Sequence, residues 1–135
     1  MKVLVNKIEM LNNDQAVGKM VVEDIDKDET LQEMYRVLGC DCVDVRSFEV
    51  DGHLYDVWFD EEFMLKDGPK FPTVLLTANE GWGAEVLICG SVMFAKADSF
   101  GNTIGLNDND IKRLKKFAPK SAANAVRYAM ALVGR

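Results

Sequence analysis

Three consecutive carboxylates, Asp60, Glu61 and Glu62, are the residues of this 135-residue chain whose types and spacing come nearest to a reactive group. They follow the alternating segment 55–59, so a strand through them places Asp60 and Glu62 side by side on the solvent face, with Asp56 behind them. Paired carboxylates can hold a hard cation such as Mg²⁺ and support a metal-assisted hydrolase or nuclease. They can equally end a strand and discourage edge pairing. No base, nucleophile or cationic clamp accompanies them in the sequence, so we expect a non-catalytic role.

Other signatures of catalysis are missing from the sequence. It contains no P-loop, no dinucleotide-binding glycine motif, no zinc-protease motif and no nucleophile elbow. The single histidine, His53, has no serine or cysteine partner by spacing. A zinc site built from His53 with Cys40, Cys42 and Cys89 is conceivable, but free cysteines are more often small buried hydrophobes. We therefore expect no metal, no cofactor and no enzymatic activity.

A long segment over residues 65–83 is expected to be irregular, because Pro69 and Pro72 interrupt a regular strand ladder. Long loops often bind or close over a ligand. Trp82, between two glycines of this segment, is suited either to stacking on a ligand or to plugging the core. The concavity between the carboxylates and this loop is therefore our candidate site for a ligand or partner, with Asp60 to Glu62 and Trp82 as its residues.

Strand patterns predict most of the scaffold. Apolar segments beginning at Val3 and Met20 predict an early hairpin. The Asp51-Gly52 pair between alternating segments predicts a second hairpin, and the strand after it should bury Tyr55, Val57 and Phe59 on its core face. Residues 85–96 are apolar on both faces, which is typical of a single strand at the centre of a sheet. These patterns predict an α+β fold with a mostly antiparallel sheet, one packed helix and a C-terminal helical tail.

The packed helix is predicted around residues 31–38 by apolar residues at i, i+3, i+4 and i+7, with Gly39 ending it. Its stripe consists of Leu31, Met34, Tyr35 and Leu38.

The chain is expected to form an α+β domain over residues 1–106 and a helical C-terminal extension over residues 107–135. Asn107 or Asp108 can cap the extension, and Pro119 is expected to start or kink a second helix in it. That second helix carries a stripe of mostly small apolar residues: Ala122, Ala125, Val126, Ala129, Met130 and Val133. The sequence leaves open whether this stripe docks on the chain's own domain or forms the interface of a homo-oligomer.

Charge is divided unevenly along the chain. Residues 1–105 carry 9 Lys and Arg against 20 Asp and Glu, whereas residues 106–135 carry 7 against 2. The basic tail can pack on its own acidic body or on a sister subunit. The acidic body would repel phosphates, so we do not expect nucleic acid as a partner. No apolar run approaches the roughly 20 residues of a membrane span, and no secretory signal is apparent, so we expect a cytoplasmic protein without a membrane contact.

Four segments in order, "ETLQEMYRVLGCDCVDV", "WFDEEFMLKDGPKFP", "EVLICGSVMFAK" and "IGLNDNDIKRLKKF", carry a family resemblance. They resemble domain of unknown function 3846 over about residues 19–117, with Leu31-Gln32, Gly39, the carboxylates 60–62 and Pro69 at matching places. The chain departs from the family pattern at Phe63, where glycine is usual, and after the prolines. The resemblance implies an intracellular protein of phages and conjugative elements with no established activity.

The residues favour a non-enzymatic binding protein that acts on a host protein or a small ligand, and the resemblance implies that it serves a phage or mobile element, with counter-defence as one such role. Two alternatives stay open at this point. One is the metal-assisted hydrolase or nuclease that uses Asp60 and Glu62, and the other is a purely structural homo-oligomer built on the alanine-rich stripe.

Overall fold

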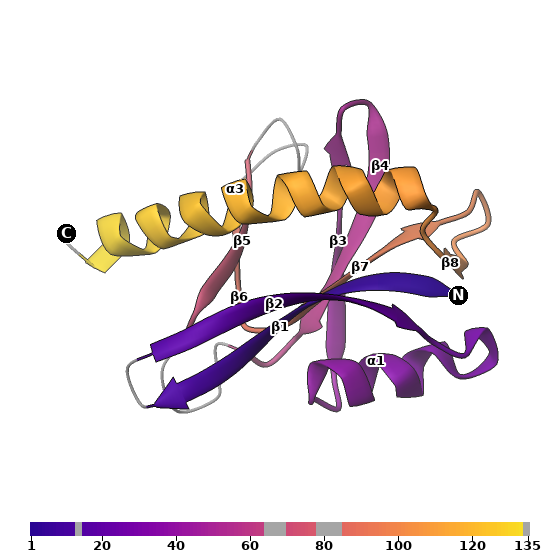
Figure 1. Ribbon diagram of the computed structural model, residues 1–135, viewed down its shortest axis with the longest axis horizontal. Coiled ribbons are helices and arrows are strands. Elements are labelled where there is room, and N and C mark those ends of the chain that lie inside the picture. The colour runs from indigo at the N-terminus through magenta and orange to yellow at the C-terminus, as the bar shows by residue number, and fades with distance from the viewer. Residues whose placement is uncertain (13–14, 64–69, 78–84, 134–135) are drawn as a thin grey trace.

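The structure is a computed structural model that describes residues 1–12, 15–63, 70–77 and 85–133. The fold is α+β, as expected, and the N-terminus and the last described turn of α3 lie toward opposite ends of the long axis (Figure 1). In chain order the elements are β1 (Lys2–Asn12), β2 (Gln15–Asp24), η1 (Lys27–Glu29), α1 (Thr30–Leu38), β3 (Val43–Val50), β4 (His53–Asp60), β5 (Pro72–Leu76), β6 (Val86–Cys89), β7 (Val92–Ala97), β8 (Thr103–Ile104) and α3 (Asp108–Val133).

An antiparallel sheet in the order β2-β1-β7-β4-β3 forms the centre of the molecule, with the short β8 paired to β7. β7 lies in the middle because residues 92–95 are apolar on both faces, and all four are fully buried. A strand covered on both faces has no use for alternating polar residues. The expected central position of this segment is confirmed.

The expectation of one strand over residues 85–96 is wrong. The chain breaks at Gly90, whose φ of +86° is open to glycine but strained for other residues. β6, before the break, pairs with β5 in a separate two-stranded sheet, whereas β7, after it, joins the main sheet. The corner is held by the Gly90 N–H, which donates to the Phe71 carbonyl at 2.8 Å.

The segment expected to be irregular contains strand β5. Pro72 stands at its first position, where a missing N–H costs no ladder bond, and the register shifts between Pro72 and Val74. The rest of β5 is buried. The prolines therefore delay the strand and do not abolish it.

Both predicted hairpins are present. β1 and β2 pair antiparallel, and β3 and β4 pair around Asp51 and Gly52, whose φ angles are both positive. A two-residue loop of this kind matches the right-handed twist of the strands it joins. Tyr55, Val57 and Phe59 of β4 are buried, as the alternation predicted.

Helices cover both faces of the main sheet, with α3 on one side and α1 on the other (Figure 1). On the α3 side, Leu114 and Ala118 pack with Phe48, Val57 and other buried residues in the larger core. On the α1 side, a smaller core forms from residues of β1, β7 and α1. Trp58 packs against this second core, so the β4 face expected to be solvent-exposed is partly covered.

α1 ends as predicted at Gly39, whose left-handed φ of +65° places its N–H on the Tyr35 carbonyl. Its buried side chains are Met34 and Val37, whereas Leu31 is 48% exposed. Leu31 therefore does not belong to the packed stripe, since the helix turns that position away from the sheet.

α3 is one continuous helix, which corrects the expectation of a second helix starting at Pro119. It begins with a reciprocal cap in which Asn107 Oδ1 accepts from the Asp110 N–H at 2.8 Å and Asp110 Oδ2 accepts from the Asn107 N–H at 2.9 Å. Pro119 is exposed, so the carbonyl that loses its helical donor can be hydrated. No helix in the part of the chain described is long and apolar enough to cross a lipid bilayer.

Candidate functional site

The three carboxylates lie where β4 ends and the chain turns. Asp60 Oδ1 accepts a hydrogen bond from the Glu62 N–H at 2.9 Å, and the Glu61 N–H donates to the Cys42 carbonyl at 3.1 Å. Asp60 is half-buried, whereas Glu61 and Glu62 are exposed. The expected strand through residue 62 is therefore two residues too long, because Asp60 itself starts the turn. Trp82, the other predicted site residue, lies outside the described residues.

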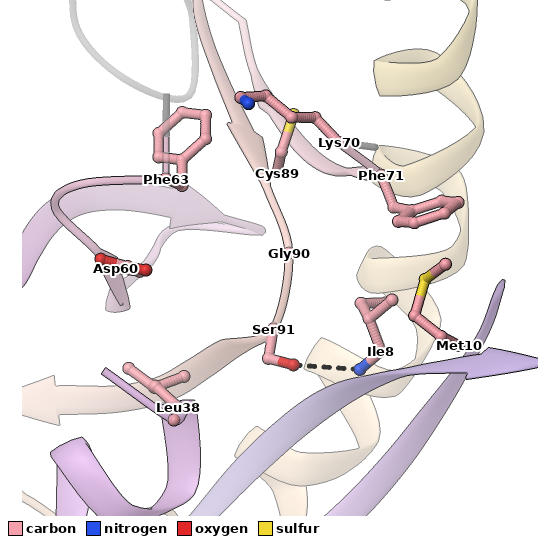
Figure 2. Close-up of a pocket in the computed structure, with 11 residues that line it drawn as sticks. Ile8, Met10, Leu38, Asp60, Phe63, Lys70, Phe71, Cys89, Gly90 and Ser91 are labelled. Carbon is pink, nitrogen blue, oxygen red and sulfur yellow. Dashed lines mark hydrogen bonds between the residues drawn. The ribbon is translucent and has the colours of Figure 1, made fainter. Parts of the chain in front are cut away.

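A cavity of about 490 Å³ opens beside Asp60 (Figure 2). Its walls come from β1, the end of α1, the turn after β4, the segment entering β5 and the link between β6 and β7. The lining residues are Ile8, Met10, Leu38, Gly39, Asp60, Phe63, Lys70, Phe71, Cys89, Gly90 and Ser91.

The cavity exists because the central strand leaves the sheet. β1 pairs with β7 only as far as Asn6 and Val92, yet β1 continues beyond this point to Asn12. At Gly90 the chain turns out of the sheet into β6, so β1 and β4 lose the strand between them. Ser91 Oγ then accepts the Ile8 N–H at 3.0 Å in place of a strand partner.

The lining combines apolar groups with one acidic and one basic side chain. Asp60 lies on the wall next to Leu38, and Lys70 lies on the wall that carries Cys89 (Figure 2). The rings of Phe63 and Phe71 are half-buried. Such a surface can bind an organic molecule through its apolar body and orient it by its charges.

Neither the Ser91 hydroxyl nor the Cys89 thiol of the cavity is activated as a nucleophile. Burial raises the pKa of the Cys89 thiol, and the Lys70 charge offsets this only in part. The thiol therefore stays protonated at neutral pH. The only histidine, His53, lies at the other end of β4, about 23 Å from Asp60 at about 3.3 Å per residue.

The carboxylates do not converge on a cation position in the described residues. Asp56, the third carboxylate of the hydrolase hypothesis, accepts a hydrogen bond from the Ser47 hydroxyl on β3 at 2.8 Å. In the ranges that the structure describes, no three His, Cys, Asp or Glu side chains are grouped closely enough to hold a metal ion. Cys42 lies near the carboxylates, and its pKa is raised by desolvation and by Glu62 and Glu61.

The stripe predicted as an oligomer interface is divided between contact with the sheet and solvent. Ala125 is fully buried, and Ala122 and Ala129 are half-buried. The other three are exposed: Val126 by 43%, Met130 by 68% and Val133 by 88%. The structure thus packs the first half of α3 on its own sheet and leaves an apolar face on the second half.

Most of the cavity lining could not be identified from the sequence. The predicted loop over residues 65–83 includes Lys70 and Phe71 but not Phe63, and the sequence pattern of Ile8 and Met10 is that of ordinary strand residues. These residues come from separate segments of the chain, and the break at Gly90 creates the cavity that they line.

The fold and the cavity define a class of protein: an α+β domain with a ligand-sized cavity whose described lining carries no catalytic constellation. The sequence matches the family model described as a domain of unknown function (DUF3846) over residues 10–118. The chain belongs to this family, and the matched region includes all of the cavity lining except Ile8.

Comparison with curated proteins and with solved structures found no match to the chain.

Proposed function

We propose that this chain is a non-enzymatic binding protein whose small organic ligand occupies the cavity beside Asp60. The observation that carries the proposal is the cavity itself, whose volume of about 490 Å³ lies within the usual range for small-molecule sites. Most of its lining is apolar, with a few polar groups converging on it. A small ligand fits this hollow better than the flat surface of a host protein does.

The charges around the cavity support a ligand with a cationic group at one end. Asp60 lies on the same wall as Leu38 and Gly39, the C-terminal end of α1. Helix C-termini carry partial negative charge, which adds to that of the carboxylate. An ammonium group beside Asp60 and an apolar body between Phe63 and Phe71 would satisfy both walls. Lys70 would favour an anionic group at the opposite end.

Binding is favoured over catalysis by the state of the reactive groups. The Cys89 thiol is protonated, the Ser91 hydroxyl already accepts a backbone N–H, and the histidine is distant. A hydrolase would need a base and an activated nucleophile within reach of the same substrate atom.

We propose further that the protein acts in the cytoplasm for a phage or mobile element, and that it sequesters the ligand from a host defence. Support for this role comes from the family resemblance alone. We expect expression of the chain in a bacterium with an active defence to raise the plaquing efficiency of a restricted phage, and Asp60→Asn to abolish the gain. Equal plaquing with and without the chain across a panel of defences would contradict the role in counter-defence.

Ligand binding is tested with the purified full chain. Mass spectrometry under native conditions, followed by calorimetry with any retained molecule or with a panel of amphiphilic amines, should identify a ligand. Asp60→Asn should raise its Kd by about tenfold to a hundredfold, since the variant loses a charge-assisted hydrogen bond. Phe63→Ala should weaken binding through lost apolar contact.

Glu62→Gln provides the matched control, because this residue belongs to the same turn but does not line the cavity. Its Kd should stay within about twofold of the wild-type value. Equal losses in Asp60→Asn and Glu62→Gln would show that the ligand binds to the exposed turn and not in the cavity.

A further inference from the structure

The second half of α3 presents an apolar face that the chain does not cover. Val126, Met130 and Val133 are 43%, 68% and 88% exposed. They lie at i, i+4 and i+7, so they share one side of the helix. In Figure 1 the C-terminal part of α3 extends past β5 and β6.

A second, smaller cavity of about 220 Å³ adjoins this face. It lies between the β1–β2 hairpin and α3, where Asn6 and Gly18 face Ala122 and Val126, and the start of β5 forms its floor. Its volume suits one or two apolar side chains rather than a complete small molecule, since small-molecule sites usually exceed about 300 Å³.

Asn6 is a polar group without a partner at this cavity. It is only 8% exposed, and its Oδ1 is buried without a hydrogen bond to any described residue. A methyl group added at Gly18 would approach Asn6 Oδ1 to 2.9 Å, so the glycine leaves room for the carboxamide. Buried polar groups in native proteins are hydrogen-bonded, so a donor or acceptor is expected to reach this amide from outside the described residues.

Both walls of the groove carry little charge. On the hairpin, the residues that point toward α3 pair as Leu4 with Val22, Asn6 with Met20, Ile8 with Gly18 and Met10 with Ala16. On the helix, Arg127 is the only charged residue from 121 to 133. Two copies with a net charge of −6 each repel one another least at such a neutral surface.

We propose that a second copy of this chain covers this groove, with the two α3 helices packed antiparallel about a two-fold axis near residue 128. In this register Val126 of each copy lies opposite Met130 of the other, and Met130 and Val133 reach the cavity that Ala122 and Val126 line. The contact is self-complementary, because one face carries both the protruding side chains and the hollow that receives them. Both hollows are filled at once.

The same arrangement supplies a partner for Asn6. The last four carbonyls of an α-helix have no intrahelical donor, and the antiparallel register brings the final turn of the second copy to the cavity. A flip of the Asn6 carboxamide about χ2 places its NH2 group where Oδ1 lies, and from there the NH2 group can donate to these carbonyls. The dimer does not depend on the ligand cavity, because none of these helix residues lines it.

The proposal is tested by the mass of the full chain in solution. Sedimentation equilibrium should show a dimer for the wild type at about 100 μM. Met130→Glu should raise the dimer dissociation constant by about a hundredfold or more, since two charges enter the apolar contact. Ala131→Glu is the matched control: this residue is exposed and lies about 140° around the helix from Val126, so its variant should stay dimeric.

Cross-linking tests the register. In a Cys42→Ser background, a mixture of Val126→Cys and Met130→Cys variants should oxidise to a mixed disulfide dimer faster than either variant alone. In the wild type, the Asn6 side-chain NMR signals should differ from those of Met130→Glu. The proposal would be overturned if the wild type were monomeric or if Met130→Glu stayed dimeric. It would also be overturned if each single cysteine variant formed disulfide dimers as fast as the mixture.

Discussion

Asp110 connects the first turn of α3 to the sheet through several charged contacts. Its carboxylate accepts from Lys96 Nζ at 2.7 Å, from the Tyr55 hydroxyl at 2.8 Å and from the Asn107 N–H at 2.9 Å. Arg113 also donates to the Tyr55 hydroxyl and lies 3.5 Å from Asp110 Oδ1. Burial alone would raise the pKa of Asp110, but the bonds from Lys96, the Asn107 N–H and Tyr55 outweigh it and lower the pKa.

Replacement of Asp110 by asparagine should destabilise the protein in a pH-dependent way. At pH 7 the loss should be about 2 kcal/mol, which is below the range for fully buried pairs because Lys96 is partly exposed. A carboxylate with a lowered folded-state pKa contributes its full stability above the unfolded pKa of about 3.9 and loses it as the pH falls through the folded value. The difference in unfolding free energy between wild type and Asp110→Asn, measured in urea, should therefore shrink as the pH falls below about 4.

Asp108→Asn serves as the control for this experiment, because Asp108 is in the same helical turn but its side chain is 93% exposed. We expect a change of a few tenths of a kcal/mol at every pH. An Asp110→Asn effect that stays constant with pH would mean that lost packing, and not the charge, accounts for the destabilisation.

Strand β5 depends on helix α3 for two of its backbone hydrogen bonds. β6 occupies only one edge of β5, and Ser121 of α3 binds the other edge: its hydroxyl accepts from the Leu75 N–H at 3.0 Å and donates to the Leu75 carbonyl at 3.2 Å. Ser121 is 2% exposed, so water does not replace it readily. One hydroxyl on the helix thus satisfies two backbone groups of a strand that has one strand neighbour among the described residues.

Ser121→Ala should lower the free energy of unfolding by about 1–3 kcal/mol, because it leaves a buried N–H and a buried carbonyl without partners. Amide hydrogen exchange should report the change locally, with faster exchange at Leu75 than in β7. Asn124→Ala, three residues further along and exposed, should leave both measurements unchanged. Protection at Leu75 that survives in Ser121→Ala would contradict this role of the hydroxyl.

The whole molecule uses the two halves of α3 differently. Ile111, Leu114 and Ala118 belong to the main core, together with residues from six strands. From Val126 onward the described side chains are exposed or half-buried. The basic first half therefore completes the acidic body, whereas the second half is available for other contacts.

Truncation should separate these two halves. A chain ending at residue 126 should fold with a melting temperature within a few degrees of the parent, and a chain ending at residue 107 should not fold, because it loses several buried side chains worth about 2–5 kcal/mol each. The parent for the chain ending at residue 126 is the full-length Met130→Glu variant, so that loss of the proposed dimer does not contribute to the difference in melting temperature. Circular dichroism measures both outcomes, and a folded chain ending at 107 would show that α3 is dispensable.

Local chemistry in the sequence determined the hairpins, the end of α1 at Gly39, the cap at Asn107 and the buried side chains of β4. Each depends on a short-range rule: positive φ at Asp51 and Gly52, a left-handed glycine, or strict alternation. The α+β class followed from these elements. The Asp60 end of the candidate site was also predictable, because a carboxylate cluster after a strand stands out by type alone.

Only the tertiary structure decided where the chain leaves the sheet. The cavity exists because of this break, so the tertiary structure decided the cavity as well. A run that is apolar on both faces reads as one strand, and the sequence does not say that Gly90 divides it between two sheets. The same holds for the face of β4 that α1 partly covers, and for the two halves of α3. Burial depends on which distant segment packs against a surface, so residues such as Phe63, Phe71 and Met10 became a site only when the fold brought them together.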